Sequence, residues 1–296
     1  MIDVAQHPSE LVEEPTAAVP ARPVPKLRWW RELAVALVVY KMYELIRGGA
    51  DTGASPDAFR NARWIVEIEQ ATFLAFERSL QQLVLPFDWL VTFTNNYYGT
   101  AHFLVTAGVM VWLYLFRKEG YRHMRNVFGI MMVVGLVIFW LFPLAPPRML
   151  PCNDSIPVAA APDAPALGEC LVDTLHSGTA VLSYKSEAAK AITNPYAAMP
   201  SFHFGWALWC GLAVSWYGRS RWLRRIGWFH VSFTTFAIIV TANHYVLDAV
   251  GGGLVVALGC WGASRIERSR RPVEAATEPA ATMTDLTLSP AAPSAQ

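Results

Sequence analysis

The sequence predicts an all-α membrane protein with six transmembrane helices and one amphipathic helix at the outer interface. Hydrophobic side chains make up 54% of the 296 residues. They form separated runs long enough to cross a bilayer, which takes about 20 helical residues. Clusters of Lys and Arg alternate between those runs, as cytoplasmic loops require. A composition this apolar excludes an ordinary soluble domain.

The six runs lie near residues 31–48, 99–116, 124–144, 200–217, 225–243 and 245–264. The first is short and carries Lys41 and Glu44, so it predicts a span less strongly than the others. Basic clusters precede the first run, join the second to the third and the fourth to the fifth, and follow the sixth. We therefore expect a multi-pass protein of the cell membrane with both termini in the cytoplasm.

The chain divides into a six-span membrane domain, residues 29–268, and two disordered cytoplasmic tails, residues 1–28 and 269–296. The first tail holds acids and prolines and lacks the basic start and apolar core of a signal peptide. The second has the Ala, Pro, Thr and Ser composition of a segment that cannot bury enough surface to fold. The net charge of +1 comes from dispersed basic residues, which indicates no nucleic-acid partner.

The first outer segment, residues 55–86, predicts one amphipathic helix. Its apolar residues recur at helical spacing opposite a polar face. The apolar face holds Trp64, Ile65, Ile68, Phe76 and Leu83, and the polar face holds Arg63, Glu67, Glu77 and Gln81. Such a helix either lies along the outer membrane interface or packs on the bundle.

Two of the four cysteines, Cys152 and Cys170, share the outer loop 145–199, where an oxidising compartment allows a disulfide. Whether they pair is open at this point. Cys210 and Cys260 fall inside spans, and we expect them to be core thiols.

Polar residues gather where three spans reach the outer boundary. The stretches "FPLAPPRML", "MPSFH" and "TANHYVLDAVGG" place Arg148, Ser201, His203, His244 and Asp248 there. These side chains can act together only if the three helix ends are neighbours in the bundle.

His244 and Asp248 are four residues apart and would share one face of a helix. A carboxylate at that spacing accepts from one ring nitrogen and leaves the other free as a base or nucleophile. The alternative is a plain helix pair. Inside an apolar span, however, an ionisable pair is costly and is usually functional.

His203 follows Pro200 and Ser201, where Pro suits the first turn of a helix and Ser can cap it. Free backbone N–H groups at a helix start bind anions, so His203 is placed to protonate a leaving oxygen. Arg148 follows two prolines and either grips a phosphate or anchors lipid headgroups. Together these groups fit phosphoryl transfer through a histidine intermediate. Because no dense cluster of His, Cys or carboxylates is present, we expect no metal and no cofactor.

At these residues the sequence resembles the type 2 phosphatidic acid phosphatase superfamily. "PSFH" matches its Pro-Ser-Gly-His element except that Phe202 replaces Gly, and "HYVLD" matches its His-x-x-x-Asp element. The resemblance implies that His244 is the nucleophile, Asp248 its partner and His203 the general acid. The family's Lys is absent, since Leu141 stands seven residues before Arg148, and no Ser-Arg pair precedes His244 at family spacing.

"FPLAPPRML", "NPYAAMPSFH" and "ANHYVLD" look instead like the divergent branch that includes fungal inositol phosphorylceramide synthase and actinobacterial relatives. That likeness implies headgroup contacts at Asn95, Tyr98, His102 and Tyr43, and a second phosphate ligand at Arg47. It also implies a phospholipid or isoprenoid-phosphate substrate.

The leading hypothesis is thus a metal-independent inositolphosphotransferase-like enzyme of lipid metabolism with its site facing outward. A lipid phosphate or prenyl diphosphate phosphatase would use the same His/His/Asp site. Two classes without catalysis stay open, a proton-coupled transporter and a lipid-binding relative. The sequence leaves the donor headgroup, the acceptor and the oligomeric state undetermined.

Overall fold

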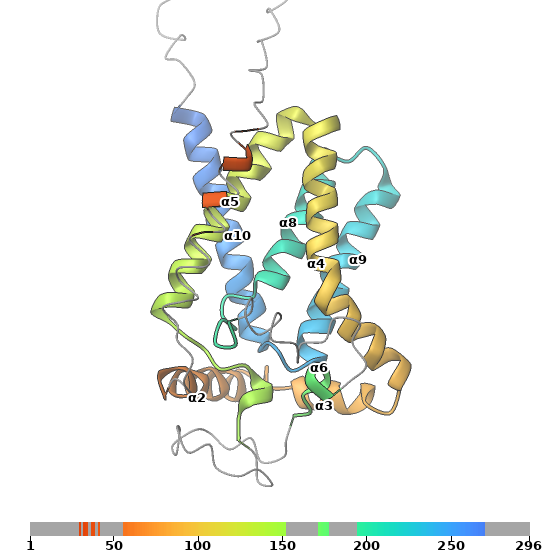
Figure 1. The fold of residues 1–296 in the computed structure, drawn as a ribbon, viewed down its shortest axis with the longest axis vertical. Coiled ribbons are helices and arrows are strands. Elements are labelled where there is room, and N and C mark those ends of the chain that lie inside the picture. The colour runs from red at the N-terminus through yellow and green to blue at the C-terminus, as the bar shows by residue number, and fades with distance from the viewer. Residues whose placement is uncertain are drawn as a thin grey trace, which may run out of the picture.

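The computed structural model describes residues 56–151, 171–177 and 194–269, together with isolated residues between 30 and 41. Within these residues it is all-helical, as predicted, and the one strand-like contact is an isolated bridge between Leu144 and Ala197. Five long helices run up and down in turn as a bundle (Figure 1). They are α4 (Asp88–Phe116), α5 (Lys118–Leu141), α8 (Phe202–Tyr217), α9 (Arg221–Val240) and α10 (Val246–Ser269).

The bundle is held by packing between helices that are distant in sequence. α10 lies against α5 and α8, α8 lies against α9, and α4 lies against α8 and α9. At the end where α4 turns into α5, the buried side chains of Leu113, Met124, Trp209 and Ala263 belong to one cluster. The Trp209 indole donates to the Met124 carbonyl at 2.8 Å, so its buried N–H group is satisfied.

Three of the described helices, α4, α5 and α10, are long and apolar enough to cross a membrane. The helix α8 has 16 residues, which is shorter than a span of about 20. The helix α9 opens with Arg221, Arg224 and Arg225. The predicted first run lies mostly outside the described residues, so six spans stay a prediction. Large apolar side chains are exposed on the flanks of the bundle, among them Leu104, Trp140, Leu254 and Trp261, as contact with lipid would require.

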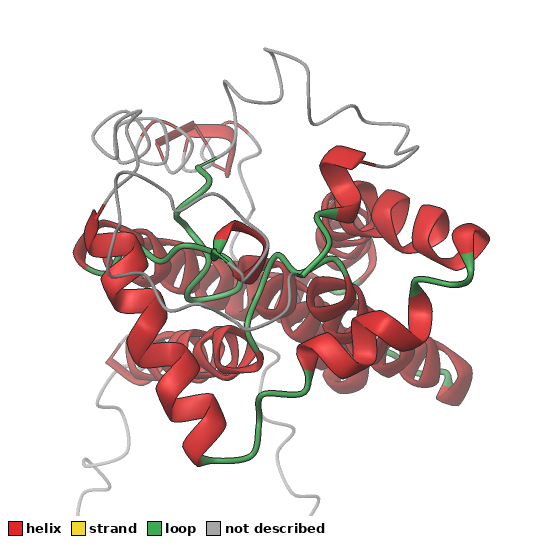
Figure 2. Cartoon of the chain, turned by 90° about the horizontal axis from the view of Figure 1, so that it is seen from below, coloured by secondary structure: helices red, strands yellow, loops and turns green. Residues whose placement is uncertain are grey.

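Short elements cover the opposite end of the bundle, and we call them the cap: α2 (Pro56–Ala71), α3 (Glu77–Val84), η1 (Pro147–Met149) and α6 (Thr174–Ser177). Figures 1 and 2 show α2 and α3 lying across the helix ends. The buried face of α2 packs against Leu144, Tyr196 and Tyr245. Of the two alternatives for this segment, packing on the protein therefore applies to α2.

The prediction of one amphipathic helix over residues 55–86 is wrong. The chain leaves the helix after Ala71 and re-enters it at Glu77, with Phe73 at a positive φ of 59°. The predicted polar face is also wrong in part, because Glu77 and Gln81 are 7% and 2% exposed. Both side chains bond to buried backbone near the end of α9 and the start of α10. These side chains are buried despite their polarity because they satisfy backbone groups that would otherwise lack hydrogen-bond partners.

The span boundaries also differ from the predicted ones. The helix α4 begins at Asp88 and not near residue 99, because residues 88–98, which mix apolar side chains with Thr and Asn, are helical as well. α10 continues to Ser269, past the predicted end near residue 264. The domain limits at residues 28 and 268 border segments outside the described residues and stay predictions.

Candidate active site

A short turn joins α9 to α10 at the cap end and carries the first site residue. The helix α9 ends at Val240, and Ala242 then takes a positive φ of 53°. Backbone bonds from the N–H groups of Asn243 and His244 return to the Ile238 carbonyl, which closes the helix end. The Asn243 amide donates to the Thr241 carbonyl at 3.0 Å. These bonds fix the backbone that presents His244.

The His244 ring is oriented by two acceptors on the same nitrogen. Its Nδ1 lies 2.9 Å from the Ala198 carbonyl oxygen and 3.2 Å from Asp248 Oδ2. Neither neighbour can donate when Asp248 is ionised, so we assign the ring proton to Nδ1. The lone pair is then on Nε2, which is the tautomer that a nucleophilic histidine needs.

Asp248 is fully buried at the start of α10. Its Oδ2 also accepts from the Tyr245 N–H at 2.9 Å, so the carboxylate is fixed by its own helix turn as well as by His244. The backbone carbonyl of Asp248 accepts from the Ser201 N–H at 2.9 Å. This last bond ties the start of α10 to the start of α8.

The helix α8 begins at Phe202, and Ser201 caps it by accepting from the Phe204 N–H at 3.3 Å. The predicted cap is therefore confirmed. One residue into the helix, His203 places its Nδ1 at 3.4 Å from His244 Nε2. The structure thus brings together two of the three predicted helix ends with their histidines facing each other.

Two side chains of α4 lie against His203. The Tyr98 ring stacks on the imidazole with centroids 4.1 Å apart and planes 18° apart. The His102 ring lies 4.2 Å from it, and its Nδ1 is 3.0 Å from the Tyr98 carbonyl oxygen. Tyr98 and His102 were implied as headgroup contacts, and the structure places both at the general-acid candidate itself.

The replacement of Gly by Phe202 is accommodated by α5. The Phe202 ring packs edge-on against Phe139 with centroids 4.7 Å apart. A Cβ on Gly135 would collide with the Phe202 ring. The sequence offered no signal for this pairing, because Gly135 lies inside an apolar run.

Arg148 lies in η1, beside the turn that carries His244. Its backbone N–H donates to the Ala242 carbonyl at 3.0 Å. Its guanidinium pairs with the Asp173 carboxylate, with Nε 3.4 Å from Oδ2, and its side chain is 11% exposed. The segment that carries Arg148 therefore reaches the turn with His244 through a backbone bond. The Arg148 guanidinium itself pairs with Asp173, a residue that no sequence pattern pointed to.

Residues 171–177 are bound to the cap and to α4 by side-chain amides. Gln81 bonds both the N–H and the carbonyl of Val172, at 2.8 and 2.9 Å. The Asn95 amide donates to the Thr174 carbonyl and accepts from the Thr174 hydroxyl. Asn95 was implied as a headgroup contact, but in this structure its amide is engaged with Thr174.

Two buried carboxyls of the cap, Glu69 and Glu77, also reach the start of α10. Glu69 stands on the face of α2 that buries Ala58, Ala62 and Ile65, so a carboxyl on an apolar stripe was the available signal. For Asp173 no such signal existed, because it belongs to a loop.

The remaining predicted residues are placed as follows. Tyr43, Arg47, Cys152 and Cys170 lie outside the described residues. Cys210 is a buried free thiol and Cys260 a half-buried one. Within the part of the chain that the structure describes, no group of three or more His, Cys, Asp or Glu side chains is arranged to hold a metal ion.

Comparison with known proteins gives one match. A family model described as PAP2 superfamily matches residues 63–262, more than half of the 296-residue chain. No curated protein and no solved structure matches. The matched residues run from the first cap helix to α10 and include every site residue on α4, η1, α8 and α10.

Proposed function

The chain belongs to the PAP2 superfamily, and on that premise we propose that it is a membrane-embedded phosphotransferase that works through a phosphohistidine. Membership indicates phosphatase or phosphotransferase chemistry. The observation that carries the proposal is the state of the His244 ring. Its Nδ1 is held by two acceptors, and its Nε2 faces His203 at 3.4 Å.

In the first half-reaction the lone pair of His244 Nε2 attacks the phosphorus of a lipid donor. An N–P bond forms, the P–O bond to the lipid breaks, and His203 gives the leaving oxygen its proton. Asp248 stabilises the positive charge that the His244 ring gains, because its carboxylate accepts a hydrogen bond from the Nδ1–H group.

In the second half-reaction an acceptor hydroxyl attacks the phosphorus. His203 takes the hydroxyl proton, a new P–O bond forms, and the N–P bond to His244 breaks. Both histidines return to their starting protonation states, so one site serves both steps. Stacking on Tyr98 restricts the rotation of His203 between the steps.

The phosphate oxygens would be bound by Arg148 and by the start of α8 with Ser201. A helix start offers unpaired N–H groups and the positive end of the helix dipole. Arg148 adds a guanidinium, which suits phosphate oxygens in pairs. Arg47 is a further candidate from the family likeness and lies outside the described residues.

The pairing of Arg148 with Asp173 favours transfer of a headgroup over hydrolysis of a phosphate monoester. A monoester carries up to two negative charges and a phosphodiester carries one. A cation already shared with a carboxylate attracts the doubly charged group less strongly. We therefore infer a phosphodiester donor, in line with the inositolphosphotransferase-like branch, and a lipid or glycan hydroxyl as acceptor.

The purified protein, in detergent with excess chelator, tests this proposal. It is incubated with labelled phosphatidylinositol, phosphatidic acid or prenyl diphosphate, each with and without a hydroxyl lipid. We expect transfer of the phospho-headgroup to the hydroxyl lipid and its loss in His244→Ala and His203→Ala.

His123→Ala is the matched control, because His123 pairs with Glu267 on α10 far from the cap and should leave the rate unchanged. Release of phosphate from the monoesters alone would replace the transferase by a phosphatase. Wild-type rates in both site variants would exclude the histidine mechanism.

A further inference from the structure

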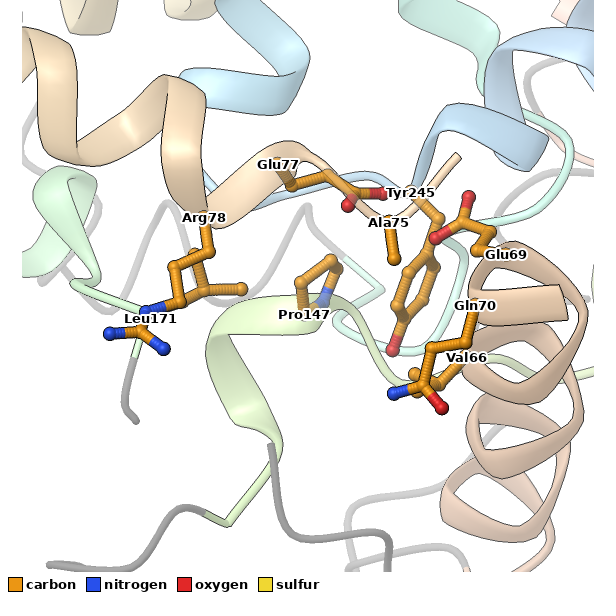
Figure 3. A pocket seen from close by; sticks show the side chains of 9 residues that line it. All are labelled: Val66, Glu69, Gln70, Ala75, Glu77, Arg78, Pro147, Leu171 and Tyr245. Carbon is orange, nitrogen blue, oxygen red and sulfur yellow. The ribbon is translucent and has the colours of Figure 1, made fainter. Parts of the chain in front are cut away.

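Two carboxyls of the cap converge on the start of α10 from different helices. Glu69 is at the end of α2 and is 1% exposed, and Glu77 opens α3 and is 7% exposed. Figure 3 shows both side chains beside Tyr245, with their carboxyls directed toward each other. Burying two acids at adjacent positions is costly unless their oxygens are bonded.

The bonds go to the backbone that follows His244. Glu69 Oε1 accepts from the Leu247 N–H at 2.8 Å, and Glu77 Oε1 accepts from the Val246 N–H at 3.2 Å. The preceding N–H, that of Tyr245, is taken by Asp248. Three successive N–H groups after His244 therefore end on carboxyl oxygens. Groups of this kind at the start of a helix have no partner within the helix.

The carboxyls of the two acids are directed toward each other (Figure 3), and a hydrogen bond between them requires a proton on one of them. Burial, and then the bond and the charge of Glu77, raise the pKa of Glu69 to about 9. The titratable groups beside the pair are Tyr245 on the turn and Asp248 on α10, whereas Arg78 on α3 lines the same pocket with its guanidinium directed away from both carboxyls (Figure 3). At neutral pH Glu69 therefore keeps its proton.

We propose that Glu69 and Glu77 are positioning residues for His244, a carboxyl pair that shares one proton and fixes the backbone of residues 245–247. The inference rests on the proposed function, because it assigns the pair a part in that reaction. The two acids act through the turn. Residues 246 and 247 lie between His244 and Asp248, so movement of their N–H groups changes the bond that orients the imidazole.

The pair lies where it can exchange its proton with the solution at the cap end. Glu69, Glu77 and Arg78 line one pocket there together with Pro147 and Leu171 (Figure 3). When the pH rises through about 9, Glu69 loses its proton and two adjacent carboxylates repel each other. We therefore expect the transfer rate to fall on the alkaline side as the turn loosens.

Two substitutions of Glu69 distinguish a role that needs its proton from a role that needs only its packing and hydrogen bonds. Glu69→Gln keeps an oxygen for the Leu247 N–H and an N–H for Glu77 but does not titrate. Its kcat at neutral pH should stay within about threefold of the wild type, and the alkaline fall should disappear. Glu69→Ala removes both bonds, and kcat should fall roughly 10- to 100-fold through misplacement of His244, with little change in KM. Glu67→Gln, an exposed acid on the same helix, is the matched control.

Thermal unfolding against pH provides a readout that does not depend on activity. Because the folded pKa of Glu69 is raised from 4.5 to about 9, its stabilising effect is full below 4.5 and is lost as the pH rises to 9. The wild-type Tm should fall across that window, and Glu69→Gln should fall less.

The proposal is overturned if folded Glu69→Ala keeps the wild-type kcat, or if Glu69→Gln keeps the alkaline fall. If the wild type transfers nothing from any donor, the proposed function fails by itself. The shared proton is then decided by the Tm profiles, and equal slopes in the wild type and Glu69→Gln would refute it.

Discussion

At the scale of single residues, the site depends on which atoms of His244 are already occupied. Ala198 and Asp248 both bond Nδ1, and this leaves Nε2 toward His203. The proposed role of Nε2 as the nucleophile follows from these two bonds, because neither partner of Nδ1 supplies a proton and the ring proton must therefore lie on Nδ1. Tyr98 and His102 contact the ring of His203, the residue that we propose as the general acid.

Asp173 carries a prediction at this scale. Asp173→Asn keeps the side-chain volume and removes the charge that Arg148 shares at 3.4 Å. Without that charge Arg148 should attract the doubly charged monoester more strongly, so the preference for monoester over diester donors should rise. The rise should be limited to about tenfold, or roughly 1.4 kcal/mol, because Asp173 is partly exposed and the pair is screened by solvent. Ratios of kcat/KM for phosphatidic acid and phosphatidylinositol measure it. The exposed acid Asp88 supplies the control Asp88→Asn. An unchanged ratio in Asp173→Asn would remove the charge argument for a diester donor.

At the scale of elements, the site depends on how closely α8 approaches α10. A Cβ on Gly252 would lie 2.6 Å from the Ser201 carbonyl oxygen, whereas one on Gly253 would meet only the Phe204 ring at 3.6 Å. Glycine at position 252 therefore lets the two helix starts touch, and the bond from Ser201 to Asp248 depends on that approach.

Gly252→Ala should lower the free energy of unfolding by about 1–3 kcal/mol, because the backbone of α8 has to move away. Transfer activity should fall with it, since His203 lies at the start of α8 and His244 lies in the turn that leads into α10, and these two parts separate. Gly253→Ala is the adjacent control and should be neutral or stabilising, because Ala favours a helix over Gly by about 1 kcal/mol. Thermal unfolding and initial rates measure both effects. Equal stability of the two variants would contradict the proposed close contact.

The sequence predicted the individual site residues better than how they come together. Ser201 as a cap follows from local rules, and the structure confirms it. The predicted pair of His244 and Asp248 on one helix face is wrong in its basis, because His244 lies in the turn before α10, but the turn still brings the two side chains into contact. The burial of Glu77 and Gln81 does not follow from local rules, because both side chains bond to backbone groups more than 150 residues away. The break at Phe73 was also not predicted. The sequence showed that Phe202 replaces the glycine of the family element. It could not show that Gly135 makes room for the Phe202 ring, because that depends on how α5 packs on α8.

At the scale of the whole molecule, the arrangement separates two ends. Arg117, Lys118, Arg221 and Arg265 lie at or near the helix ends opposite the cap, whereas His203, His244 and the buried acids lie at the cap end. Exposed apolar side chains cover the flanks between them. The prediction that the cap faces outward and the basic end faces the cytoplasm follows from this separation, and it stays a prediction.

If the bundle spans a membrane as proposed, the same arrangement places the histidines close to the boundary between lipid and water. A donor held in the membrane would present its phosphate at the level of its headgroup, which is where the starts of α8 and α10 lie in a bundle with apolar flanks. The histidines are largely buried beneath the cap, and exclusion of water would favour the proposed transfer to a bound hydroxyl over hydrolysis.

The phosphohistidine is the central claim, and direct trapping tests it. The purified protein is mixed with a phosphate-labelled donor without acceptor, quenched in alkali and digested, and the labelled peptide is identified by mass spectrometry. The account predicts an acid-labile label on His244 that is discharged when a hydroxyl lipid is added, is absent from His244→Ala and is unchanged in His123→Ala. A label on another residue, or transfer by His244→Ala at the wild-type rate, would contradict it.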